Sequence, residues 1–171
     1  MKGKFLLLIL AMFLSVGGVA KVASAAQYGP HGPQEIEQTI QEGLRYLASQ
    51  QYANGSWQNP NGYTGLILAK FAERAHELGQ DPFAKSGPHA YQYAQLNING
   101  YNWLVSQMFS SSGGLQINGP AGYTTGIAMT AIASTRKPDR IHFAGGAANG
   151  MTYNEILQAL VTYSEAAQEN S

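Results

Sequence analysis

The spacing of apolar residues predicts a helical protein. Apolar positions recur at three- and four-residue steps, which places them on one face of an α-helix. In the first such stretch, about Gln34 to Gln51, they are Ile36, Ile40, Leu44, Leu47 and Ala48. Asn54-Gly55 then predicts a turn, because both residues tolerate the left-handed conformation that often follows a helix. Further helices are expected over about 63–78, 91–109 and 124–134, and from about Met151 onward.

These helices belong to a two-part internal repeat. Residues 43–57 end a helix and enter a turn, and a similar stretch begins again at Gly100 and reaches a turn at Gly113-Gly114. Each turn is followed by a helix start of the same kind, Gly62-Tyr-Thr-Gly in the first copy and Gly122-Tyr-Thr-Thr-Gly in the second, with one residue inserted. The sequence therefore predicts two helical hairpins and the first half of a third.

The first residues read as an export signal. Lys2 and Lys4 precede an apolar run, and Ala23-Ser24-Ala25 offers a small-residue cleavage site. We expect a signal peptide over 1–25, a tether over 26–33 and the repeat domain over 34–171. An uncleaved anchor is the alternative, although the apolar run is short for a membrane span. The expected location is secreted, periplasmic or at the cell surface.

Composition removes several functional classes. The 171 residues suit one domain, and ten basic side chains balance ten acidic ones, so the basic excess typical of nucleic-acid binding is missing. Loss of the predicted signal would leave seven basic and ten acidic side chains. The sequence contains no cysteine, which excludes thiolate nucleophiles, thiolate metal ligands and disulfides.

One long segment, Ser86 to Thr135, has no Asp, Glu, Lys or Arg. Exposed helices normally carry charged residues, so two interpretations are open. The segment is an interior run with polar residues at its edges, or it forms a neutral, aromatic contact surface for a sugar, a lipid or a partner subunit.

The repeat resembles a known family. Its motif, Gly43-x-x-Tyr46-Leu47-x-x-x-Gln51-x-x-x-Gly55-x-Trp57, is similar to the glutamine–tryptophan repeat of squalene and oxidosqualene cyclases. The Gly-Tyr-Thr helix starts resemble the wider prenyltransferase and squalene-oxidase repeat family. The resemblance covers about 34–171, and it departs from the family at Glu42, where a basic residue is usual. The second copy has Met108 and Leu115 in the glutamine and tryptophan positions.

The resemblance implies an all-α fold, a partial α/α toroid of about two and a half helical hairpins. In such a fold Gln51 would bind free backbone groups at a helix end, and Trp57 would pack across the hairpin. The residues with this structural role would be Gly43, Tyr46, Leu47, Gln51, Gly55, Trp57, Trp103 and Gln107. A closed ring needs more hairpins, so we expect a fragment of a longer protein or completion by another chain.

The family's catalytic motifs do not accompany the repeat. The cyclases use an aspartate-rich acid motif, whereas Asp81 and Asp139 each stand alone in a predicted loop, and protein prenyltransferases need a cysteine to hold zinc. The four histidines lack metal-ligand spacing, and we expect ordinary surface histidines; they are His31, His76, His89 and His142. No catalytic residue, cofactor or metal is predicted.

One ligand site is suggested by the repeat. Tyr63-Thr64 and Tyr123-Thr124 both start the second helix of a hairpin. If these are the inner helices, their free N–H groups and tyrosine rings share one rim, which would bind an acidic or hydroxyl-rich ligand. The alternative is that these residues only cap and pack the helices.

Three functions are therefore open. The first is a secreted, non-catalytic repeat module that binds a small molecule, a glycan or a protein, or has a structural role. The second is the amino-terminal part of an exported terpenoid-cyclase-like or polysaccharide-active enzyme. The third is a scaffold completed by self-association. Neither nucleic acid nor a stable membrane span after signal cleavage is expected.

Overall fold

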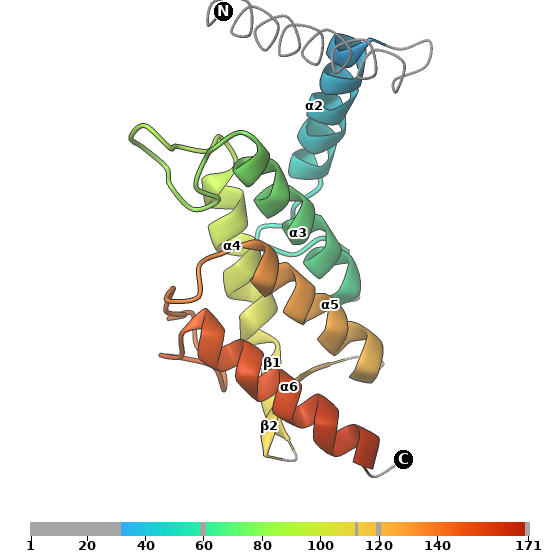
Figure 1. Ribbon diagram of the computed structural model, residues 1–171, viewed down its shortest axis with the longest axis vertical. Helices are drawn as coiled ribbons and strands as arrows, with labels where there is room; N and C mark the ends of the chain where they lie inside the picture. The colour runs from blue at the N-terminus through green and yellow to red at the C-terminus, as the bar shows by residue number, and fades with distance from the viewer. Residues whose placement is uncertain (1–31, 59–60, 112, 119–120, 170–171) are drawn as a thin grey trace, which may run out of the picture. The chain divides into compact units, whose positions relative to one another are not determined.

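The computed structural model describes residues 32–58, 61–111, 113–118 and 121–169 (Figure 1). The predicted signal peptide and most of the tether lie outside these residues. The chain divides into two units, 1–45 and 46–171. The first described helix, α2 (Pro33–Ser49), contributes only its last turn to the second unit. In the first unit its opening turn is closed by Gly32, whose carbonyl accepts from the N–H groups of Glu35 and Ile36 at 3.1 and 3.2 Å.

The second unit is mostly helical with one small sheet. Its elements are α3 (Asn61–Glu77), α4 (Ala94–Ser106), β1 (Met108–Ser111), β2 (Gly114–Ile117), α5 (Ala121–Ser134) and α6 (Tyr153–Glu169). The helices lie where apolar spacing predicts them. The all-α prediction is correct only in its coarse form, because β1 and β2 pair antiparallel, with Met108 opposite Ile117 and Ser111 opposite Gly114.

The hairpin corrects the predicted third helix, which ends at Ser106 and not at Phe109. Leu115 and Ile117 alternate with more exposed neighbours along β2, so the two apolar side chains enter the core from one face of a strand. Gly113, with φ of 79°, occupies the left-handed region in the connecting turn.

Helices α3 and α5 pack side by side and begin at the same end of the unit (Figure 1). Gly65 permits their close approach, since a Cβ there would lie 2.6 Å from Cγ2 of Ile127. From α4, the buried hydroxyl of Tyr101 reaches both helices, 2.7 Å from the carbonyl oxygen of Ala131 and 3.3 Å from that of Leu68. These contacts place the core between α3, α4 and α5.

The burial pattern of α3 recurs in α5. Thr64 and Thr124 are both buried, whereas Tyr63 and Tyr123 are both exposed. The match continues along both helices without a gap, as in the exposed pair formed by Lys70 and Thr130. The inserted residue of the sequence alignment is therefore not needed in the structure.

The two turns of the repeat each meet a helix that follows later in the chain. A Cβ added to Gly55 would collide with the carbonyl oxygen of Asn99 in α4, and one added to Gly114 would collide with that of Ala159 in α6. Both turns therefore contact a later helix, although the second does so through Gly114, one residue beyond Gly113, the counterpart of Gly55 in the sequence repeat.

The loops at the far ends of α3 and α5 are joined by charged side chains. Asp81, expected to be alone in its loop, pairs with Lys137 at 2.6 Å, and the Arg140 guanidinium lies 3.9 Å from the ring centre of Phe83. The Lys137 ammonium contributes, against the opposing effect of burial, to a lowered pKa of the Asp81 carboxyl.

The expectation of surface histidines is wrong for His142, which is buried. The reason is that its backbone pairs with the turn before α6, donating to Met151 and accepting from Gly150 at 2.9 and 2.7 Å. His76 is half-buried, with Nε2 2.9 Å from the carbonyl oxygen of Thr135, and His89 is exposed. His31 lies outside the described residues. Across the described chain, none of the helices combines the length and apolar character needed to cross a membrane.

Candidate functional site

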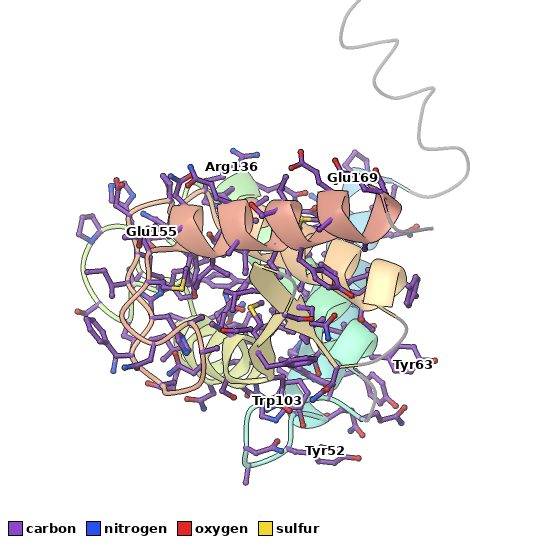
Figure 2. All side chains as sticks on the ribbon, turned by 90° about the horizontal axis from the view of Figure 1, so that it is seen from below. Tyr52, Tyr63, Trp103, Arg136, Glu155 and Glu169 are labelled. Carbon is purple, nitrogen blue, oxygen red and sulfur yellow. The ribbon has the colours of Figure 1, made fainter. Side chains whose placement is uncertain are left out.

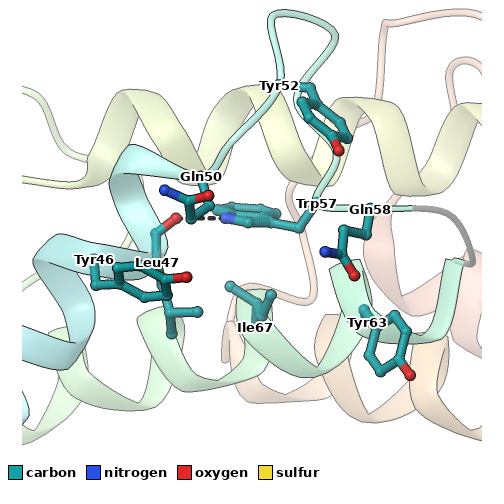
Figure 3. A pocket seen from close by; sticks show the side chains of 8 residues that line it. All are labelled: Tyr46, Leu47, Gln50, Tyr52, Trp57, Gln58, Tyr63 and Ile67. Carbon is teal, nitrogen blue, oxygen red and sulfur yellow. Dashed lines mark hydrogen bonds between the residues drawn. The ribbon is translucent and has the colours of Figure 1, made fainter.

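A cavity of about 240 Å³ lies beside the first turn of the repeat (Figure 3). Its lining comes from the last turn of α2, the turn that follows it and the start of α3. The lining residues are Tyr46, Leu47, Gln50, Tyr52, Trp57, Gln58, Tyr63 and Ile67. All eight belong to the second unit.

Trp57 forms a fixed wall of this cavity. Its side chain is only 2 % exposed, and its indole N–H donates to the carbonyl oxygen of Leu47 at 2.6 Å. The ring stacks on Phe71, with ring centres 6.1 Å apart. Its backbone is held by the Thr64 hydroxyl, which accepts from Trp57 N–H at 3.0 Å and donates to Trp57 C=O at 3.1 Å. Contacts of the Trp57 side chain and hydrogen bonds of its backbone therefore both hold this wall in place.

Three tyrosines surround the cavity with much of their surface in solvent. Tyr46, Tyr52 and Tyr63 are 66, 56 and 54 % exposed. Tyr46 stands on the last turn of α2, Tyr52 in the turn and Tyr63 at the start of α3, so three segments hold the rings around one space (Figure 3). Each ring offers an apolar face and a hydroxyl group to a ligand.

Two carboxamides add hydrogen-bonding groups. Gln50 donates to the Ser49 hydroxyl at 3.1 Å, and its amide oxygen is an acceptor. Gln58 follows Trp57 with a φ of 37°, in the left-handed region that non-glycine residues rarely adopt. Its side chain extends between Trp57 and Tyr63 (Figure 3). An amide in this position can donate to one ligand oxygen and accept from another.

None of the eight lining residues carries a formal charge. From Tyr46 to Ala69 the sequence has no Asp, Glu, Lys, Arg or His. Figure 2 shows Arg136, Glu155 and Glu169 toward one side of the molecule, and Tyr52, Tyr63 and Trp103 toward the other. The cavity can therefore supply stacking and neutral hydrogen bonds.

The four residues predicted to bind a ligand take different positions. Tyr63 lines the cavity, whereas Thr64 is buried at the start of α3, where its hydroxyl bonds the backbone of Trp57. Thr124 is buried at the matching place in α5. Tyr123 is 65 % exposed and lies outside the lining, close to Gly62: a Cβ on Gly62 would be 3.4 Å from Cε1 of Tyr123.

The residues of the repeat motif hold the turn and part of the cavity. Tyr46, Leu47 and Trp57 are lining residues. The Gln51 side-chain amide donates to the carbonyl oxygens of Gly55 and Leu96, both at 3.0 Å, and so joins the turn to α4. Gly55 has φ of 94°, which a glycine adopts without strain.

The other motif residues are not among the lining residues. Gly43 is exposed on α2. Trp103 is half-buried on α4, and Gln107 follows that helix and donates to the Ser106 hydroxyl at 3.2 Å. Four lining residues are not among those predicted from the sequence: Gln50, Tyr52, Gln58 and Ile67. The available signal was the concentration of tyrosine and glutamine in a segment without charge.

Within the part of the chain that the structure describes, no three His, Cys, Asp or Glu side chains come together as a metal site. Comparison with known proteins found no family model, no curated protein and no solved structure that matches this chain.

Proposed function

We propose that this protein is an exported, non-catalytic helical-repeat module that binds a neutral sugar in the tyrosine-lined cavity. The observation that carries the proposal is the ring of three exposed tyrosines and two glutamines around a tryptophan wall. The succession of basic, apolar and small residues over 1–25 supports export. The contacts of both turns with a later helix support an α/α hairpin array of the toroid type.

The chemistry of a sugar ring suits this lining. One face of such a ring presents C–H groups, which pack on aromatic faces, and its edge presents hydroxyls that both donate and accept. Tyrosine hydroxyls and glutamine amides can both donate hydrogen bonds to sugar hydroxyls and accept hydrogen bonds from them. Because sugar hydroxyls are uncharged, binding needs no ionised partner.

The dimensions also favour a small ligand. The cavity of about 240 Å³ falls below the roughly 300–1,000 Å³ of sites that enclose drug-sized molecules. Its tyrosines remain largely exposed, so a ligand would lie across the opening and keep one side in solvent. A single sugar ring held between Trp57 and the surrounding tyrosines fits this description.

Binding can be measured through Trp57 itself. The sequence has two tryptophans, so the substitution Trp103→Phe leaves Trp57 as the only indole reporter. The full chain with this substitution is titrated with glucose, galactose, mannose, xylose and N-acetylglucosamine, and the emission of Trp57 is followed. We expect saturable quenching or a spectral shift with at least one of these sugars.

Tyr63→Ala should weaken the binding by roughly 2- to 12-fold, because aromatic contacts contribute about 0.5–1.5 kcal/mol beyond their buried area. Gln58→Ala should also weaken it. Phe143→Ala is the matched control, since this aromatic side chain is 75 % exposed and lies outside the cavity lining. If no sugar shifts the emission, or if Tyr63→Ala behaves as Phe143→Ala does, the proposal is wrong.

A further inference from the structure

We infer that the ligand is a linear, neutral oligosaccharide, with Tyr123 as a second stacking position beyond the cavity. This inference rests on the proposed function and extends it from one sugar ring to a chain. It starts from an exposed tyrosine that the cavity does not use.

Tyr123 is placed next to the cavity by the packing of α3 against α5. Both helices begin at the same end of the unit, and Tyr63 and Tyr123 lie on their first turns (Figure 1). The Tyr123 ring lies over Gly62, the neighbour of Tyr63 in sequence, with Cε1 3.4 Å from the position of a Cβ there. The ring is nevertheless 65 % exposed. One face therefore remains available beside the tyrosines of the cavity.

The separation of the two helices indicates a ligand longer than one ring. Packed helices have axes about 8–10 Å apart, so a sugar ring held in the cavity beside α3 does not also cover an exposed ring on α5. A chain that leaves the cavity past Tyr63 meets Tyr123 next. The repeat thus places one tyrosine on the first turn of α3 and one on the first turn of α5.

The charge distribution selects neutral sugars over acidic ones. Tyr123 lies in the charge-free segment Ser86–Thr135, and the cavity lies in the charge-free segment Tyr46–Ala69. The first charged residue along α3 is Lys70, about one turn beyond the lining residue Ile67, and its ammonium pairs with Glu73 at 2.7 Å. At the other end of the segment Arg45 precedes Tyr46, and its Nε donates to the Gln41 carbonyl oxygen at 3.3 Å. The lining residues and Tyr123 themselves therefore offer no cation to a uronic acid chain.

The test is a chain-length series on the full chain with Trp103→Phe. The probes are glucose and its linear β-1,4 and α-1,4 oligomers up to the hexamer, with oligogalacturonate as the acidic comparison. We expect affinity to rise with chain length and to level off once the chain reaches Tyr123. The acidic series should bind more weakly than the neutral series of equal length.

The substitution Tyr123→Ala tests the second stacking position independently of the cavity. It should weaken the hexamer by roughly 2- to 12-fold and leave glucose unchanged, whereas Tyr63→Ala should weaken both. Tyr123→Phe keeps the ring and should keep most of the hexamer affinity, and the urea midpoint of each variant checks that it folds.

The outcomes distinguish this inference from the proposed function. If glucose binds as tightly as the hexamer, or if Tyr123→Ala weakens both equally, the second position is wrong and a single-sugar site remains. Tighter binding of the acidic series would contradict the inference that the ligand is neutral. If no probe binds, and the single sugars of the previous panel also fail, the proposed function falls with the inference.

Discussion

Trp57 contacts several parts of the second unit, which the spacing of the motif alone does not indicate. Its indole N–H bonds the last turn of α2, its backbone bonds the Thr64 hydroxyl, and its ring stacks on Phe71. It also lines the candidate site. One residue therefore couples the stability of the second unit to the shape of the cavity.

Trp57→Ala should lower the free energy of unfolding by about 3–5 kcal/mol, the usual cost of truncating a large buried aromatic residue. Urea unfolding followed by circular dichroism measures this change without tryptophan fluorescence. Trp103→Ala is the control and should cost less, because Trp103 is only half-buried. Equal losses in the two variants would contradict a special role for Trp57.

Gly55 has two separate reasons to be glycine. Its φ is 94°, and a Cβ would collide with the carbonyl oxygen of Asn99. Gly79 shares only the first reason, since its φ is 68° but a Cβ there would meet no atom within 4 Å. The pair therefore separates backbone conformation from steric contact.

Gly79→Ala should destabilise the protein by about 1–2 kcal/mol, the cost of a left-handed conformation for an L-residue. Gly55→Ala should cost more, because α4 must also move away from the turn. Chemical unfolding of the two variants side by side gives the difference. A smaller loss for Gly55→Ala would mean that α4 does not rest on this turn in solution.

At the scale of elements, the start of α6 shows how far local sequence rules reach. Thr152 and Glu155 have capping-box spacing, and the structure confirms this box: Thr152 N–H donates to the Glu155 carboxylate at 2.7 Å and Glu155 N–H donates to the Thr152 hydroxyl at 3.2 Å. The hydrogen bonds from Thr152 lower the pKa of the Glu155 carboxyl.

Removal of this cap should destabilise the protein measurably. Thr152→Ala should cost about 1 kcal/mol, within the range for loss of a threonine N-cap. Thr162→Ala is the matched control inside α6, where the hydroxyl only bonds the Gln158 carbonyl four residues back, and it should change stability little. Thermal unfolding of both variants checks this, and an equal change in both would argue against the cap.

Helices α2 and α6 could be predicted because each has an apolar face with regular spacing. Helices α4 and α5 have no such face, and the turn signals around them and the internal repeat allowed their prediction. The hairpin of β1 and β2 was missed because its strands are short and Ser110, Ser111 and Ser112 suggest a loop. Gly113-Gly114 followed by alternating Leu115 and Ile117 was the available signal. The burial of His142 was also missed, since it depends on how a glycine-rich turn folds around one side chain.

The site was less predictable than the fold. Tyr63 was selected through the repeat, but Tyr46 was selected only as a structural residue, and Tyr52 not at all. Their convergence on one space depends on the turn between α2 and α3, whose path is fixed by tertiary bonds such as that from Gln51 to Leu96. Periodicity in sequence does not encode such a path.

At the scale of the whole molecule, buried His142 should make stability depend on pH. Burial lowers its pKa, and the positive Arg140 adds to this, whereas the Gly145 carbonyl, 3.2 Å from Nε2, acts in the opposite direction. Below the unfolded-state pKa of about 6.5 the unfolded chain therefore binds more protons than the folded one. Stability should fall as pH decreases through this range.

The expected result is a lower melting temperature at about pH 5 than at about pH 7, above the range where most carboxylates titrate. His142→Gln should flatten this dependence, and His89→Gln, at an exposed histidine, should leave it as it is. Thermal unfolding across this pH range measures the slopes. A slope that survives His142→Gln would assign the dependence to other groups.

The bond from Gln51 to Leu96 has a consequence for the order of events during synthesis. The first turn of the repeat is complete only when a carbonyl 45 residues farther along the chain is in place. At typical rates of about 5–20 residues per second, the ribosome needs roughly 2–9 s to make that stretch. During this interval the nascent chain has an unfinished turn, and a chaperone that acts on unfolded segments has time to engage it.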